Sequence, residues 1–145
     1  MSPRGLSGLA LDTLTYSTSE IATLFTLLSK PESYPVLVHC TLGKDRTGLV
    51  VLLVALLCGA GEEGVVRDYE RSGVELEGER EEREREVGKI GLAMGFAGVE
   101  EGWVGVVCGW LEREWGGVEG YLWRGCGVSE EVIEGVRRIL VARWE

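Results

Sequence analysis

The spacing of apolar residues along the chain predicts several helices. Between Thr18 and Ser29, apolar side chains recur every three or four residues, which is the period of one face of a helix. Ser17 and Glu20 stand three residues apart at the start of this stretch, the spacing of a capping box. We therefore expect an amphipathic helix from about Thr18 to Ser29.

The second half of the chain also carries helical patterns. Helices are expected over about 62–71 and 77–90, and the second of these has glutamates and arginines three and four residues apart, which is typical of a solvated face. Trp103 and Trp110 lie at helical spacing, so we interpret the tryptophan-rich stretch as core. Ser129 is placed to cap a last helix with an apolar stripe. The stripe consists of Val132, Ile133, Val136 and Leu140.

One short apolar segment has the composition of a strand. Val36-Leu37-Val38 is apolar and rich in β-branched residues, follows two prolines, and is too short for a helix, as expected of a buried parallel strand that ends at His39 and Cys40. From Thr47 to Cys58 the chain is apolar on all sides, which predicts a helix buried all round. The fold class expected is α/β, mostly helical, with Val36–His39 as its one secure strand.

Length and charge restrict what the chain can be. Its 145 residues fit a single domain, residues 1–145. A net charge of −9 argues against a nucleic-acid partner. The longest apolar run, Leu49–Cys58, has ten residues, whereas a transmembrane helix needs about 20. We expect no transmembrane segment and a cytoplasmic location. The cysteines are far apart and the chain has one histidine, so neither disulfides nor a metal site are expected. They are Cys40, Cys58, Cys108 and Cys126.

The polar loop between the predicted strand and helix has the features of an anion site. A strand that ends at Cys40 and a helix that starts near Thr47 direct backbone N–H groups and the positive end of a helix dipole at one point. Arg46 adds a planar guanidinium that can bind two phosphate oxygens, and Gly43 allows a tight bend. The same positive field favours a thiolate, so Cys40 is expected to be a nucleophile.

Two other loop chemistries fit less well. A nucleotide-binding P-loop requires Ser or Thr after its lysine, whereas Asp45 follows Lys44 here. A Cys–His protease pair would use His39 as its base, but adjacent residues of a strand point to opposite faces. We therefore expect His39 to lie buried beneath the loop and to support its shape.

Residues 39–48 carry a resemblance to a known family. The segment His39-Cys40-Thr41-Leu42-Gly43-Lys44-Asp45-Arg46-Thr47-Gly48 resembles the HCxxGKDRTG signature of cysteine-dependent tyrosine and dual-specificity phosphatases. It is most similar to atypical fungal and bacterial members, which also act on phosphoinositides. Looser similarity extends over most of the chain.

The resemblance implies a role for each residue of the signature. Cys40 would attack phosphorus and form a phosphocysteine, while Arg46 and the amides of residues 41–46 hold the phosphate oxygens. Those loop residues are Thr41, Leu42, Gly43, Lys44, Asp45 and Arg46. The charge of Lys44 would suit a doubly phosphorylated or lipid head group, and Thr47 would hydrogen-bond the leaving sulfur. No metal or other cofactor is implied.

The resemblance leaves the general acid open between two aspartates. Asp45 is the favoured candidate, because relatives with aspartate before the arginine are thought to protonate the leaving group from within the loop. Asp12 is the alternative, since it lies 28 residues before Cys40 and many phosphatases of this class keep their acid on a separate upstream loop.

One departure from the family pattern leads to two hypotheses. Family members have on the order of a hundred residues before the cysteine, which carry most of a sheet, so we expect this chain to be an N-terminally incomplete domain. A lone strand cannot satisfy its own backbone, and an exposed edge would favour self-association. The chain is either an active phosphatase for phosphotyrosine proteins or phosphoinositides, or a non-catalytic fragment or pseudophosphatase that at most binds phosphate.

Overall fold

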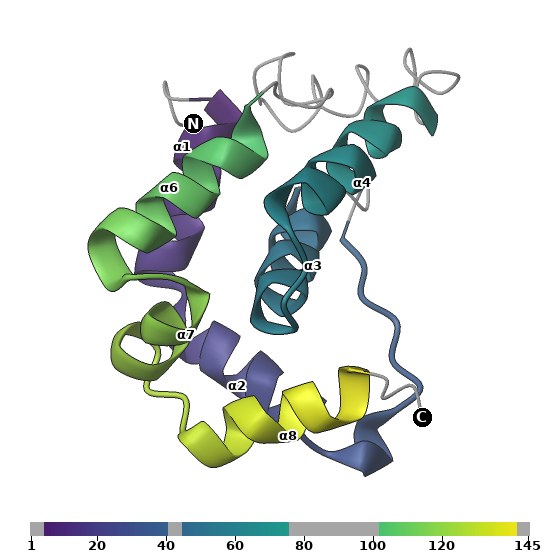
Figure 1. The fold of residues 1–145 in the computed structure, drawn as a ribbon, viewed down its shortest axis with the longest axis vertical. Helices are drawn as coiled ribbons and strands as arrows, with labels where there is room; N and C mark the ends of the chain where they lie inside the picture. Colours follow the sequence, from purple (N-terminus) through teal and green to yellow (C-terminus); the bar gives the residue numbers. More distant parts are fainter. Residues whose placement is uncertain (1–4, 41–44, 76–101, 142–145) are drawn as a thin grey trace.

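A computed structural model of the chain describes residues 5–40, 45–75 and 102–141. Helices dominate this part of the chain (Figure 1). In chain order they are α1 (Gly5–Tyr16), α2 (Thr18–Leu28), the 3-10 turn η1 (Pro31–Ser33), α3 (Arg46–Leu57), α4 (Glu62–Glu75), α6 (Trp103–Trp115), α7 (Val118–Gly120), the π-helical turn η4 (Tyr121–Gly125) and α8 (Glu130–Leu140).

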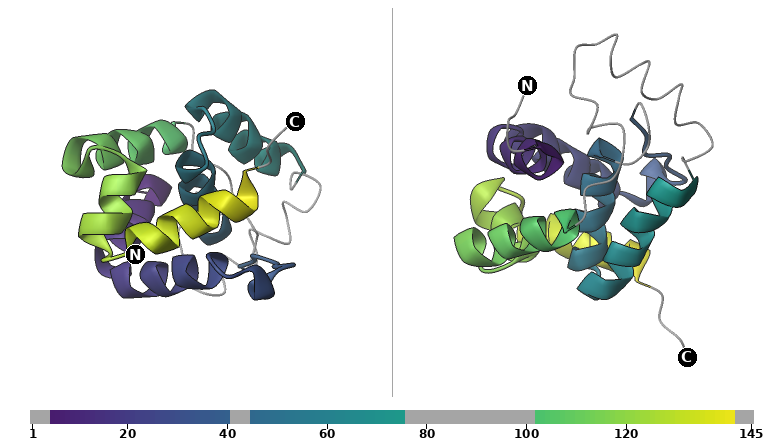
Figure 2. Two further views of the ribbon diagram at one scale, coloured as in Figure 1. Left: turned by 60° about the horizontal axis from the view of Figure 1, so that its bottom comes forward. Right: turned by 90° about the horizontal axis from the view of Figure 1, so that it is seen from above.

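The helices pack around one apolar core. α6 contacts both α1 and α4, α3 contacts α4 and α7, and α8 crosses the bundle against α2 (Figures 1 and 2). The most deeply buried large side chains come from every part of the described chain. They include Leu14, Phe25, Leu52, Leu53, Trp103, Leu111, Tyr121 and Ile133.

The helix predicted near Thr18 is confirmed as α2, but its capping box does not form. Ser17 occupies the N-cap position and its side chain makes no cap hydrogen bond. Its backbone continues the preceding helix instead, because the N–H of Ser17 donates to the carbonyl of Thr13 at 2.9 Å. α1 therefore runs almost directly into α2, and Ser17 has φ −113° and ψ 32°, outside the extended conformation of a capping serine.

The predicted strand Val36–His39 is not formed among the described residues. The segment is extended but belongs to no ladder, and it runs along the outside of α3 (Figure 1). Its side chains are not buried either, since Val36 is 48% and Leu37 is 83% exposed. A strand requires backbone partners on neighbouring strands, and the described part of the chain has none to offer. The mostly helical part of the prediction is confirmed, whereas the α/β class is not seen here.

The helix that follows the loop is buried on one side instead of all round. α3 buries Leu49, Leu52, Leu53 and Leu57, while Val51 is 39% exposed. The expectation of a fully covered helix is therefore wrong, because no sheet forms among the described residues to cover its remaining face. Within the described residues no helix, α3 included, is long and apolar enough to cross a membrane.

The other predicted helices are confirmed where the structure describes them. The helix expected over 62–71 is α4, which continues to Glu75, and the tryptophan-rich stretch is α6 with Trp103 and Leu111 in the core. The side chain of Ser129 accepts a hydrogen bond from the N–H of Val132 at 3.2 Å, so it caps α8 as expected. The charged helix predicted over 77–90 lies outside the described residues.

Candidate functional site

Two arms of the chain bring the signature residues to one end of α3. The extended segment after Tyr34 ascends beside α3 and ends at Cys40, and α3 then descends from Arg46 (Figure 1). Cys40 is half-buried and Arg46 is exposed. Thr41, Leu42, Gly43 and Lys44, which join the two arms, lie outside the described residues. The geometry that would join Cys40 to Arg46 in one loop therefore stays a prediction.

The start of α3 supplies the electrostatic part of an anion site. Asp45 occupies the N-cap position, and its carbonyl accepts the N–H of Leu49 at 2.9 Å, which is the first bond of the helix. The amides of the first turn have no acceptor within the helix and carry the positive end of its dipole. The side chain of Asp45 makes no cap hydrogen bond to these amides.

Thr47 lies in the first turn of α3 with its hydroxyl inside the protein. Its Oγ1 is buried and has no hydrogen-bond partner among the described residues. An unpaired buried hydroxyl costs free energy, so such groups are usually satisfied by a ligand, a water or a neighbouring loop. The hydroxyl of Thr47 is therefore available to hydrogen-bond a ligand, a water or the neighbouring loop.

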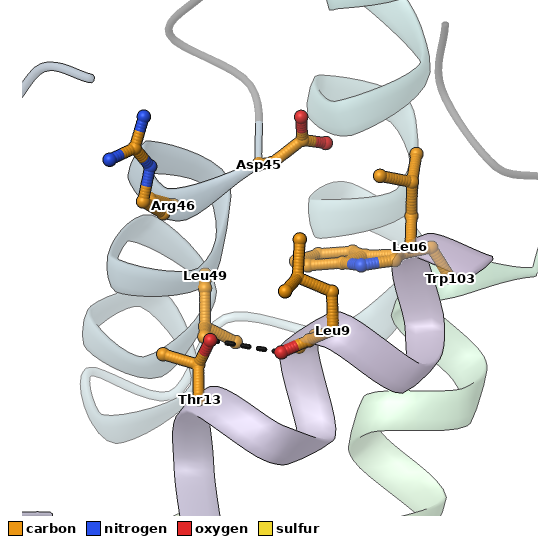
Figure 3. Close-up of a pocket in the computed structure, with 8 residues that line it drawn as sticks. Leu6, Leu9, Thr13, Asp45, Arg46, Leu49 and Trp103 are labelled. Carbon is orange, nitrogen blue, oxygen red and sulfur yellow. Dashed lines mark hydrogen bonds between the residues drawn. The ribbon is translucent and has the colours of Figure 1, made fainter. Parts of the chain in front are cut away.

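Asp45 and Arg46 point to opposite sides of the start of α3 (Figure 3). The carboxylate of Asp45 lies over Trp103, and its Oδ1 is buried. The guanidinium of Arg46 lies on the other side of the helix start, and the residue is exposed. In this conformation the two side chains do not converge on a common point.

A small pocket beside Asp45 is walled by residues of α1 that the sequence analysis did not connect with the site. It holds about 20 Å³, roughly the space of one water. Its lining from α1 consists of Leu6, Leu9, Ala10 and Thr13. These positions follow the i, i+3, i+4, i+7 pattern of one helix face, so the apolar period was the signal that could have identified them.

Asp12, the alternative general acid, is on the same helix but not in the pocket wall. It follows Leu11 and precedes Thr13, which does line the pocket. Because successive residues of a helix are about 100° apart, the side chain of Asp12 leaves α1 in a different direction from that of Thr13. The geometry thus brings Asp45, and not Asp12, into the pocket next to Arg46.

An aromatic pair supports the start of α3 from below. Tyr69 of α4 and Trp103 of α6 stack with ring centroids 4.5 Å apart and planes 15° apart. A Cβ added at Gly48 would lie 3.7 Å from the ring of Tyr69, so α3 approaches the stack closely at this glycine. Both rings are buried, and they fix the height at which the first turn of α3 rests.

His39 lies on the surface, not beneath the loop. Its side chain is exposed, which differs from the buried position expected. The expectation depended on a strand in which alternate residues face a covered layer, and that layer is not formed among the described residues. A supporting role for His39 therefore stays a prediction.

Comparison with known proteins agrees with the signature. Residues 3–142 match the model of the tyrosine phosphatase family. The chain is 31% identical to a tyrosine-protein phosphatase of Nostoc commune over 91% of this chain and 48% of that protein. It is 30% identical to the triple specificity protein phosphatase PtpB of Mycobacterium tuberculosis over 74% of this chain and 44% of that protein. The chain thus spans about half the length of the curated relatives it matches.

Proposed function

Because this chain belongs to the tyrosine phosphatase family, we propose that it hydrolyses phosphomonoesters through a phosphocysteine on Cys40. The observation that carries the proposal is the position of Cys40 and Arg46 at the two ends of one short loop, beside the N-terminus of α3. That arrangement combines a nucleophile with an anion cradle, the two requirements of phosphoryl transfer to sulfur.

In the proposed reaction, the thiolate of Cys40 attacks phosphorus and the bond to the leaving oxygen breaks. Asp45 gives its proton to that oxygen, so the leaving group departs as an alcohol or phenol. Water then attacks the phosphocysteine and loses a proton to Asp45, and the sulfur leaves as a thiolate that accepts a hydrogen bond from Thr47. Inorganic phosphate is the second product. The chain's own residues perform each of these steps.

The loop residues would hold the phosphate during both steps. Arg46 binds two equatorial oxygens, and the amides of residues 41–46 bind the others. Since Arg46 and Asp45 point to opposite sides of the start of α3 in this structure, we propose that the side chain of Arg46 reorients when phosphate binds.

The proposed substrate is phosphotyrosine in proteins, with a phosphoinositide head group as the competing candidate. The Nostoc relative is named a tyrosine-protein phosphatase, and the mycobacterial relative is named a triple specificity phosphatase. Lys44 provides a second positive charge beside Arg46, which would favour a substrate with more than one phosphate. With a net charge of −9, long anionic polymers such as nucleic acid are not proposed as partners.

We also propose that residues 1–145 form one domain in which Val36–His39 becomes a strand once neighbouring strands are present. The exposure of Val36 and Leu37 supports this, because apolar β-branched sequence rarely stays in water. Pairing of the segment between two copies is the proposed route of self-association. A cytoplasmic location is proposed from the scattered cysteines, which lack close pairs suited to disulfides.

The test is an aryl-phosphate assay on the 145-residue chain, with circular dichroism on the same sample. We expect Cys40→Ser to abolish turnover and Cys58→Ser, at the far end of α3, to retain it. Arg46→Lys should reduce kcat/KM by at least about 100-fold, because an ammonium cannot hold two oxygens at once. Undiminished turnover in Cys40→Ser, or loss of turnover with EDTA, contradicts the mechanism.

A pair of aspartate variants separates the two candidate acids. Asp45→Asn should slow hydrolysis of phenyl phosphate more than that of para-nitrophenyl phosphate, since a poor leaving group needs the proton and a good one does not. Asp12→Asn should affect both substrates equally. The reverse pattern would transfer the acid role to Asp12.

The second candidate function is phosphate binding without turnover. The observations in its favour are the exposed strand segment and the divergence of Asp45 and Arg46. In that case inorganic phosphate would protect Cys40 from alkylation in a folded chain that shows no hydrolysis.

A further inference from the structure

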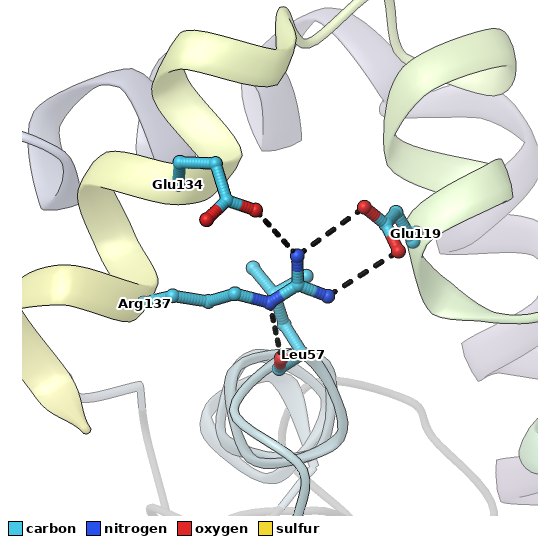
Figure 4. Close-up of polar contacts among 4 residues, drawn as sticks. All are labelled: Leu57, Glu119, Glu134 and Arg137. Atoms are coloured by element: carbon cyan, nitrogen blue, oxygen red, sulfur yellow. Dashed lines mark hydrogen bonds and ion pairs between the residues drawn. The ribbon is translucent and has the colours of Figure 1, made fainter.

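Arg137 connects three helices at the end of α3 that is remote from the signature loop. Its Nε donates to the carbonyl of Leu57 at 3.0 Å, in the last turn of α3 (Figure 4). Its two terminal nitrogens donate to the carboxylate of Glu119 in α7 at 3.2 and 3.3 Å. Nη1 also donates to Glu134 in α8 at 2.8 Å. One guanidinium therefore ties α8 and α7 to α3.

This contact differs from an ordinary surface ion pair. The side chain of Arg137 is 31% exposed, and its donors are distributed between a two-oxygen grip on Glu119 and a backbone carbonyl that α3 itself leaves unpaired. The hydrogen bond to Glu119 raises the pKa of Arg137 above its ordinary value, so the cation persists at any relevant pH. The geometry specifies where the end of α3 lies relative to α7 and α8.

The extended segment that leads to Cys40 is attached at the same end of the molecule. The hydroxyl of Tyr34 donates to the carbonyl of Leu28 at 2.8 Å, which fixes the start of the extended segment against the end of α2. Cys58 lines the same pocket as Arg137. Burial raises the pKa of Cys58, and the charge of Arg137 opposes part of that rise. Burial also raises the pKa of Tyr34, and Cys58 raises it further.

The position of Arg46 depends on the direction of α3. The helix has twelve residues, so Arg46 and Leu57 are separated by about 17 Å along a stiff rod. Near its start α3 rests on the Tyr69–Trp103 stack, and at its end it is held by Arg137. Between these two contacts α3 packs against the core through Leu49, Leu52 and Leu53, so it moves as a unit. A shift at Leu57 therefore changes the direction of the whole helix, and with it the direction in which Arg46 and the first-turn amides point.

We propose that Arg137 is a positioning residue for the anion site: by holding Leu57 and Glu119 it sets the direction of α3, and through α3 the placement of Arg46. This inference rests on the proposed function of the loop, because it concerns the same phosphate cradle. Arg137 does not touch the substrate. Its effect is on how well the cradle is formed before phosphate arrives.

Protection of Cys40 by inorganic phosphate measures the cradle without requiring turnover. Alkylation of Cys40 by iodoacetamide is followed by mass spectrometry at increasing phosphate, at a temperature where circular dichroism shows every variant folded. Arg137→Gln should raise the half-protecting phosphate concentration about fivefold, at the lower end of typical coupling between separate sites. Arg137→Lys, which keeps the charge but not the fork, should give a smaller increase.

Arg138→Gln is the matched control, because it removes the same charge from the next residue of α8. The exposed Arg138 lines the same pocket but makes none of the hydrogen bonds by which Arg137 holds Leu57 and Glu119 in the described part of the chain. It should leave the half-protecting concentration unchanged. Suppose that phosphate protects Cys40 in the wild type. If Arg137→Gln then leaves the half-protecting concentration unchanged, or Arg138→Gln raises it equally, the role of Arg137 is overturned and the proposed anion site is not. No protection of the wild type overturns the proposed anion site and this inference together.

A second variant covers the case in which Arg137→Gln does not fold. Glu119→Gln alters a side chain that is 57% exposed and leaves the bond from Arg137 to Leu57 in place. It should raise the half-protecting concentration about twofold, a fraction of the typical coupling because part of the contact remains. An unchanged value in a folded Glu119→Gln chain then overturns the inference.

Discussion

Tyr121→Phe removes one hydroxyl from the centre of the core. Tyr121 is 0% exposed, and its hydroxyl donates to the carbonyl of Leu14 at 2.7 Å, joining η4 to the last turn of α1 across 107 residues. The substitution loses that hydrogen bond and leaves the carbonyl of Leu14 buried without it. We expect unfolding to become easier by about 2 kcal/mol, from about 1 for the bond and a similar cost for the unpaired acceptor.

The same hydroxyl makes the difference between wild type and variant depend on pH. Burial raises the pKa of Tyr121 far above its ordinary value of 10.0, and a hydrogen bond with Cys126 raises it further. Because the pKa of Tyr121 is higher in the folded than in the unfolded chain, its contribution to the free energy of unfolding is fully present below pH 10. The contribution declines at higher pH, where the tyrosine of the unfolded chain ionises and that of the folded chain does not. From pH 7 to pH 10.5 the advantage of wild type should fall by about 0.8 kcal/mol, from about 2 to about 1.2.

Urea unfolding followed by circular dichroism at pH 7 and pH 10.5 provides the measurement. Tyr16→Phe is the control, because that side chain is 82% exposed and the same deletion there should change stability by less than about 0.5 kcal/mol at either pH. Equal stability of Tyr121→Phe and wild type at pH 7 would refute the buried hydrogen bond. A difference that stays constant to pH 10.5 would refute the raised pKa.

Two further predictions concern helix packing and thiol reactivity. Gly109→Ala in α6 should increase the free energy of unfolding by up to about 1 kcal/mol and so raise the melting temperature, because alanine favours the helix and a Cβ there meets nothing within 4 Å. Gly135→Ala in α8 should lower it, because its Cβ would lie 3.1 Å from the Cβ of Ser29 and 3.2 Å from the Ser29 carbonyl oxygen; melts that shift in the same direction would contradict this packing. Mild peroxide followed by mass spectrometry should find Cys40 oxidised first, because burial raises the pKa of Cys108 to about 11 and raises that of Cys58 and Cys126 as well. Earlier modification of any of those three thiols would contradict the assignment of Cys40 as the nucleophile.

Features that depend on neighbours in sequence were predictable. The apolar period placed α2, α6 and α8, because helices satisfy their backbone within the segment itself and bury a face whose spacing can be read from the residues. Ser129 was identified as a cap for the same reason, since its bond partner is three residues away. The order of Cys40, Arg46 and Thr47 around one loop is likewise a matter of local spacing.

Features that depend on distant contacts were not predictable. Val36–His39 has the composition of a strand, but composition does not supply the neighbouring strands that its N–H and C=O groups require, so the described segment remains extended and exposed. The prediction that His39 is buried was wrong for the same reason. The exposure of Val51 on α3 could not be predicted either. The sequence shows that a residue is apolar, but it does not show which side of its helix other elements will cover.

By itself the sequence determined the helical character of the chain and the order of the residues in the phosphatase signature, because both follow from spacing within a few positions. The tertiary structure decided how the start and the end of α3 are supported. It placed Asp45 against Trp103 and the apolar face of α1, and it brought Arg137 to the carbonyl of Leu57 from 80 residues away. Such placements result from the packing of whole helices, where each side chain's direction is set by what the other elements leave free. These side-chain placements therefore form only when the helices pack around the core.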